Sequence, residues 1–176
     1  MPDRRITRTR EALIGALNHL VLDRRQRHIR VADIVAEAGV GRSTFYEHYP
    51  SADAVLLESL ATPMAALADA GAGKGDLAKV TWLLAHFWEN RQRARDMMMG
   101  QLDRKMMRLL AGMIEQRLGD TPLAIPTRLA AAQLAEASLA PIRGWVLAEA
   151  PCTPEALAAA ICRCGAAMVA SLAETP

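Results

Sequence analysis

The amino-acid sequence predicts an all-α fold. Of its 176 residues, 34 are Ala and 22 are Leu, against 16 Val plus Ile and seven aromatic residues. Ala and Leu rank high in helix propensity, whereas β-branched and aromatic residues favour strands. Helical segments separated by Gly, Pro and capping residues account for nearly the whole chain. The hydrophobic content of 52% argues against disorder, and the length suits one compact body or a small domain joined to a larger one.

Four helices are predicted in the first 70 residues. Apolar positions in the first helix recur on one stripe, which is typical of a helix that faces a core. A Gly-Val-Gly segment ends the second helix and Pro50 ends the third. Ser51 is a good N-cap for the fourth, in which Pro63 predicts a kink. The predicted ranges are 7–22, 31–38, 42–48 and 52–70.

Four further helices are predicted in the rest of the chain. Glycine-rich residues 71–75 form a break, after which Asp76 caps the next helix. Thr127 is expected to cap a long helix, and Thr153 followed by Pro154 is a strong helix start. The predicted ranges are 77–95, 102–118, 127–150 and 154–173.

Charge is unevenly distributed along the chain. The net charge is only +2, but residues 1–30 carry eight Arg against three acidic residues, whereas residues 51–176 carry twelve basic and thirteen acidic residues. A basic segment attached to a near-neutral body is typical of a protein that meets a polyanion at one end. A solvated basic tail would give the same pattern.

The sequence gives little indication of a membrane span, a redox role or catalysis. The longest uncharged run, residues 12–22, has 11 residues, whereas a membrane-spanning helix needs about 20. We therefore expect no membrane span and a cytoplasmic protein, associated with the nucleoid when bound to DNA. The three cysteines do not suggest a disulfide framework, and Cys162 and Cys164 point to roughly opposite sides of a predicted helix. No metal site, cofactor or catalytic constellation is expected.

Residues 30–49 carry the clearest functional signal. Two short helices joined by a Gly-containing turn indicate a helix-turn-helix, and Gly39 can adopt the positive φ that such a turn needs. Ile34 and Phe45 are expected to close a small core. The outer face of the second helix then presents side chains suited to phosphates or base edges, namely Arg42, Ser43, Thr44, Tyr46 and His48. Similar turns also occur in all-α proteins that bind no DNA.

Three motifs extend this interpretation: IVAEAGV at residues 34–40, STFYEHY at 43–49 and SAD at 51–53. In residues and spacing they resemble the DNA-binding domain of TetR-type (tetracycline-repressor-like) transcriptional regulators, over residues 6–60. The resemblance implies that Arg42 and Ser43 reach the major groove and that Thr44 and Tyr46 contact phosphates. It further places two residues at the edge of the contact, His48 at the groove edge and Arg30 near the DNA backbone. It also implies a mobile basic arm, made of Arg4, Arg5, Arg8 and Arg10.

Three positions depart from the family pattern. Gly41 stands where the family usually has a Ser that caps the recognition helix, and Val35 replaces an Ala. Ala52, followed by Asp53, replaces the usual Lys. The last change implies that one phosphate contact is missing at the start of the fourth helix.

The resemblance implies a helix-turn-helix domain over residues 1–50, a connecting helix at 51–70 and a helical regulatory and dimerisation domain at 71–176. The last two predicted helices are rich in small residues that allow close helix approach. They are the expected interface of a homodimer, which would read a palindromic double-stranded operator as two half-sites. Intramolecular packing or a compositional bias would explain the same Ala content.

The expected function is that of a repressor released by a small apolar ligand. Met-rich and aromatic side chains could line its site, namely Trp82, His86, Trp88, Met98 and Met106. Their helical spacing fits ordinary core packing as well. The alternatives are a regulator of the same fold that responds to a protein partner or to no ligand, and a helical enzyme. The sequence shows no nucleophile–base pair or paired carboxylates for an enzyme.

Overall fold

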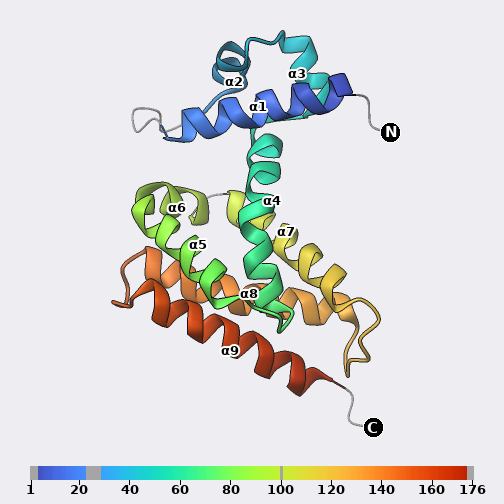
Figure 1. Cartoon of the computed structure of the whole chain (residues 1–176), viewed down its shortest axis with the longest axis vertical. Helices are drawn as coiled ribbons and strands as arrows, with labels where there is room; N and C mark the ends of the chain where they lie inside the picture. The colour runs from blue at the N-terminus through green and yellow to red at the C-terminus, as the bar shows by residue number, and fades with distance from the viewer. Residues whose placement is uncertain (1–3, 23–28, 100, 174–176) are drawn as a thin grey trace. The chain divides into compact units, whose positions relative to one another are not determined.

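A computed structural model describes residues 4–22, 29–99 and 101–173 (Figure 1). Within these ranges the chain forms nine helices, and the only β-pairing is an isolated bridge between Leu123 and Ala173. The all-α prediction is therefore confirmed. The helices are α1 (Arg4–Leu22), α2 (Val31–Ala38), α3 (Arg42–His48), α4 (Ala52–Gly71), α5 (Leu77–Glu89), α6 (Arg91–Met98), α7 (Gln101–Leu118), α8 (Thr127–Val146) and α9 (Pro154–Leu172).

The chain divides into two compact units inside α4, between Ala61 and Thr62. We call them the amino-terminal unit (Met1–Ala61) and the carboxy-terminal unit (Thr62–Pro176). The sequence-based limits at residues 50 and 71 lie on either side of this point, and they stay a prediction about functional domains.

The core of the amino-terminal unit joins α1, α2, α3 and the start of α4. Leu13, Ile34, Phe45 and Val55 are each completely buried within it. Gly39 ends α2 with φ +65°, a left-handed conformation that favours glycine. The tight turn and the bounds of α2 and α3 are thus as the sequence predicts.

The predicted basic arm is wrong for the residues that the structure describes. The first helix begins at Arg4, three residues before the expected start, so Arg5, Arg8 and Arg10 are helical. Arg is a good helix former, and the Thr9 hydroxyl donates to the carbonyl of Arg5 at 3.0 Å. The positive charge of Arg5, Arg8 and Arg10 therefore belongs to a helix and not to an extended tail.

The single helix predicted at 77–95 is two helices, separated at Asn90. This residue leaves the helical conformation (φ −104°, ψ 31°), and its side-chain amide donates to the carbonyl of His86 at 3.0 Å. Asn competes for backbone groups in this way and so interrupts helices. At the other end of α5, the Asp76 carboxylate accepts from the N–H of Ala78 at 3.0 Å, which confirms the predicted cap.

The predicted bounds of α8 are wrong at its carboxyl end, and the expected Thr127 cap is absent. Pro126 occupies the cap position without a side-chain hydrogen bond, and the helix ends at Val146 instead of residue 150. Beyond this end, Ala148 has a φ of +61°, and the indole N–H of Trp145 donates to the carbonyl of Cys152 at 2.8 Å. This folded-back segment replaces the last helical turn.

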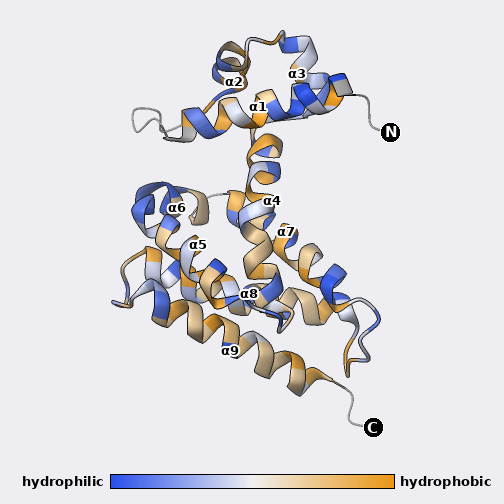
Figure 2. Ribbon diagram, viewed as in Figure 1, coloured by the Kyte–Doolittle hydropathy of each residue, from blue (hydrophilic) through white to orange (hydrophobic). Residues whose placement is uncertain are grey.

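The carboxy-terminal unit packs α7 on α8 and α5 on α9. The buried side of α8 includes Leu134, Leu139 and Ile142, and α9 begins at a cap made by the Thr153 hydroxyl, which accepts from the N–H of Ala156 at 3.2 Å. Figure 2 shows that α9 is apolar along most of its length. By length and composition alone, α4 and α9 could each cross a membrane, with 39% and 22% of their apolar windows buried in the fold.

Candidate nucleic-acid interface

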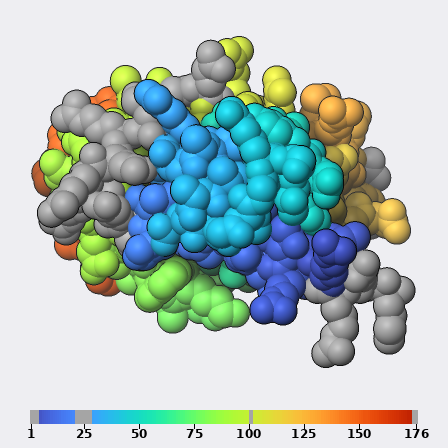
Figure 3. Space-filling model, turned by 90° about the horizontal axis from the view of Figure 1, so that it is seen from above, coloured from blue at the N-terminus to red at the C-terminus, as the bar shows by residue number. Residues whose placement is uncertain are grey.

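Helix α3 is anchored by one aromatic side chain and exposes its neighbours. Phe45 is completely buried, and the adjacent Tyr46 is 52% exposed while its ring packs edge-on against Phe45 at 5.4 Å. Arg42 and Ser43 in the first turn are also exposed. The anchor therefore fixes α3 with its polar residues directed outward, and Figure 3 shows the side chains of α2 and α3 next to one another on one face.

The structure places all six predicted DNA-binding residues in the amino-terminal unit. Five lie on α3, and Arg30 directly precedes α2. The backbone N–H of Arg30 donates to the carboxylate of Asp33 at 2.8 Å, and its side chain is exposed. Thr44 and His48 are half-buried. The two short helices thus bring the predicted set together on one small unit.

Several carboxylates of this unit have partners of opposite charge or N–H donors. Glu37 accepts from the His19 ring at 2.7 Å, and Asp33 receives the Arg30 N–H. Glu58 is paired with Arg10. These three carboxylates are therefore engaged inside the unit.

A three-residue cluster joins α1, the end of α3 and α4. The Arg10 guanidinium lies over the Tyr49 ring, 4.8 Å from its centroid, and its Nε donates to Glu58 Oε1 at 3.2 Å. A second bond joins Nη2 to Glu58 Oε2. Burial and, secondly, the Glu58 carboxylate raise the pKa of Tyr49 to about 12, and the bond to Glu58 raises the pKa of Arg10. The sequence does not indicate this cluster, because no local pattern pairs Arg10 with Glu58, 48 positions apart.

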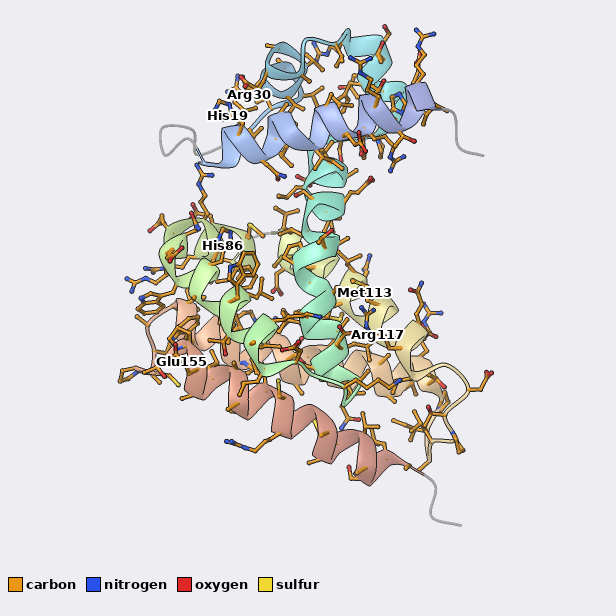
Figure 4. All side chains as sticks on the ribbon, in the orientation of Figure 1. His19, Arg30, His86, Met113, Arg117 and Glu155 are labelled. Atoms are coloured by element: carbon orange, nitrogen blue, oxygen red, sulfur yellow. The ribbon has the colours of Figure 1, made fainter. Side chains whose placement is uncertain are left out.

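The five candidate ligand-binding residues fall into exposed and buried groups. Trp82 is 64% exposed and stacks on His86 at 5.7 Å, and Figure 4 shows His86 on α5. Trp88 is 40% exposed and stacks on Trp145 at 4.7 Å. Met98 and Met106 are buried. Among the described residues, the ring and hydrogen-bond contacts do not join the two groups, so a shared ligand site stays a prediction.

A polar tie that the sequence did not indicate links α7 to α4 in the carboxy-terminal unit. The Nε of Arg117 donates to Asp69 at 2.5 Å, and its terminal nitrogens donate to the carbonyls of Met113 at 2.9 Å and Ala65 at 3.4 Å. Figure 4 labels Arg117 and Met113 on α7. The arrangement satisfies a half-buried guanidinium and joins two helices of the core.

Comparison with known proteins relates the chain by structure alone. The sequence matches no protein-family model and no curated protein. A TetR transcriptional regulator from Streptococcus agalactiae 2603V is similar in structure, with a TM-score of 0.54 and 24% identity, over 93% of this chain and 96% of that one. A dihydroxyacetone kinase operon activator, DhaS, has a TM-score of 0.53 and 16% identity, over 94% of this chain and 98% of that one. At these identities the likeness establishes a shared fold.

Proposed function

We propose that this chain, which shares the fold of TetR-type regulators, is a transcriptional regulator that binds double-stranded DNA in a sequence-specific manner. One observation supports the proposal most: α3 is anchored by the buried Phe45 and exposes Arg42, Ser43 and Tyr46. Arg side chains suit base edges, and hydroxyls suit phosphates. In this proposal Arg42 and Ser43 enter the major groove, and Thr44 and Tyr46 hold the DNA backbone.

Two residues at the edge of this surface complete the proposed contact. His48 is half-buried at the end of α3, and Arg30 is exposed before α2. We assign them to the groove edge and to a phosphate, respectively. Both positions belong to the same unit as α3, so one rigid unit would carry all six contacts.

We further propose a homodimer formed by α8 and α9. A reading helix of about two turns covers too few base pairs by itself, whereas a twofold dimer reads two half-sites about one DNA turn apart. The free face of α9 fits this role because small exposed residues surround a single exposed charge, Arg163; they are Ala156, Ala160, Ala166, Ala167 and Ala170. The expected mass in detergent-free buffer is twice the chain mass of 19.1 kDa. A monomer, or a chain that needs detergent to stay dissolved, contradicts the proposal.

Regulation by a small apolar ligand in the carboxy-terminal unit is the accompanying hypothesis, with release from the operator as its effect. The alternative is a regulator of the same fold that answers to a protein partner or to no ligand. Because DhaS is an operon activator, the fold by itself does not decide between repression and activation. We place the protein in the cytoplasm, where it would meet DNA.

Selection of bound duplexes from a random DNA pool by the full chain tests the proposed function. We expect enrichment of a palindromic consensus, whose half-site spacing reports the dimer geometry. A non-palindromic consensus would contradict the dimer but not the DNA contact. Failure to enrich any sequence over non-specific DNA would overturn the proposed function.

A further inference from the structure

The Arg10–Tyr49–Glu58 cluster lies where α3 ends. Tyr49 is the carboxyl cap of α3, in an extended conformation (φ −140°, ψ 134°), and its N–H donates to the Phe45 carbonyl at 2.9 Å. Its ring lies 6.0 Å from the Phe45 ring and is only 3% exposed. Tyr49 thus links the end of α3 directly to the anchor that fixes this helix.

Arg10 holds the Tyr49 ring, and Glu58 holds Arg10. The two bonds from the guanidinium to the Glu58 carboxylate fix the plane of the guanidinium, and that plane covers the ring at 4.8 Å. An Arg–carboxylate fork is directional, which a Lys ammonium is not. Three helices of the amino-terminal unit therefore meet at one geometrically defined point.

The ion pair of this cluster contributes little to stability by itself. The side chains of Arg10 and Glu58 are 40% and 36% exposed, and ion pairs this exposed contribute little to folding. The Tyr49 hydroxyl is buried and makes no hydrogen bond of good geometry among the described residues, but Arg10 and Glu58 are near enough to shift its pKa. An exposed ion pair that adds little stability but defines the orientation of a buried ring is well suited to placing α3.

We propose that Arg10, Tyr49 and Glu58 are positioning residues that orient α3 for base reading without contacting DNA themselves. The proposal rests on the proposed function. Base-edge contacts need side chains placed within about 0.5 Å, whereas phosphate contacts carry no sequence information. Loosening the cluster should therefore weaken binding to the selected sequence more than binding to non-specific DNA.

For Glu58→Gln, the proposal and simple electrostatics predict opposite changes in DNA affinity. Glu58→Gln removes a negative charge from a DNA-binding unit, which by charge alone would tighten DNA binding. Positioning predicts a loss of about fivefold in affinity for the selected duplex, equal to about 1 kcal/mol. Glu37→Gln is the matched control, because Glu37 is similarly exposed at 38% and pairs with His19, away from the end of α3.

The experiment measures dissociation constants of the full chain for the duplex recovered by random-pool selection and for a scrambled duplex of equal length. Arg10→Lys keeps the charge but loses the fork, and Tyr49→Leu removes the ring. Tyr49→Phe keeps the ring and loses only the unpartnered hydroxyl. Each protein is measured at several salt concentrations, and its melting temperature is recorded.

The proposal predicts that Glu58→Gln, Arg10→Lys and Tyr49→Leu lose affinity for the selected duplex, with the scrambled duplex and the salt slope unchanged. Tyr49→Phe should match the wild type, and Glu37→Gln should show only the charge effect, which is equal or slightly tighter binding to both duplexes. Equal losses on both duplexes would show a purely structural role, and a salt slope reduced by about 0.9 in Arg10→Gln, which removes the charge, would show a direct phosphate contact. Either result, or unchanged affinity in all variants, overturns the proposal. If the wild type itself selects no duplex, the proposed function fails instead.

Discussion

Helix α9 crosses the end of α4 at Gly165, and the closeness of this crossing makes one substitution predictable. A Cβ added at Gly165 would lie 3.0 Å from the carbonyl carbon of Ala70 and 3.4 Å from the Cα of Gly71, with the Ala70 carbonyl oxygen closer still. Carbon atoms prefer separations of about 3.5–4.0 Å. Because these obstacles are backbone atoms, no side-chain rotation relieves the clash, and the two helices must separate.

The size of the effect follows from two opposing contributions. Gly165→Ala gains about 1 kcal/mol in helix propensity, while overpacking a tight contact costs about 1–3 kcal/mol. A backbone clash belongs at the upper end, so the net loss in the free energy of unfolding is about 2 kcal/mol. For a chain of this length that loss lowers the melting temperature by about 4–8 °C.

Gly112→Ala is the matched control. Gly112 also lies inside a helix, α7, but no atom lies within 4 Å of an added Cβ. Only the propensity gain applies, so its melting temperature should rise by about 2–4 °C. Thermal unfolding followed by far-UV circular dichroism measures both variants. A Gly165→Ala protein that melts at or above the wild-type temperature would refute the close crossing of α9 and α4.

Three other substitutions test separate parts of the account. Ala52→Lys should tighten DNA binding and steepen the salt dependence by about one phosphate contact, and an unchanged slope would count against placing this residue at the DNA backbone. The pKa of Tyr49 is about 12 in the folded chain against an ordinary value of 10.0, so the unfolded state loses this proton first. Stability should therefore fall as the pH rises from 10 to 12, and it should fall less in Tyr49→Phe; parallel pH profiles would contradict the buried phenol. Arg117→Met removes three hydrogen bonds, two of them between α7 and α4, and leaves Asp69 without this partner, which should cost about 2–3 kcal/mol in urea unfolding. A change in the free energy of unfolding below about 0.5 kcal/mol would mean that these hydrogen bonds of Arg117 do not stabilise the fold.

Helix-capping and helix-breaking residues explain why much of the fold is predictable from the sequence. Gly39 and Pro50 mark the ends of α2 and α3, and both helices have the predicted bounds. The caps at Ser51, Asp76 and Thr153 are also present, each accepting from a backbone N–H. These signals act over three or four residues, which is the range that a sequence pattern can express.

The features that the sequence did not indicate depend on individual hydrogen bonds, some of them local and some between distant segments. The break at Asn90 accompanies a side-chain hydrogen bond to the His86 carbonyl, and the early end of α8 accompanies the Trp145–Cys152 hydrogen bond. The partners Arg10 and Glu58 lie 48 residues apart, as do Asp69 and Arg117. No periodicity encodes such pairs. The six residues of the proposed DNA contact could be named from the sequence because they lie in one short segment, the helix-turn-helix.

The central claim is that the exposed face of α3 contacts DNA, and side-chain truncation on that face tests it most directly. The measurement is the affinity of Tyr46→Ala and Thr44→Ala for the duplex recovered by selection, with Trp82→Ala as the control. Trp82 is an exposed aromatic residue of the carboxy-terminal unit, so its loss should leave DNA affinity unchanged. We predict that each α3 variant loses about tenfold or more, the expected effect of removing a charge-assisted hydrogen bond to a phosphate. Near-normal binding by both α3 variants would contradict the account.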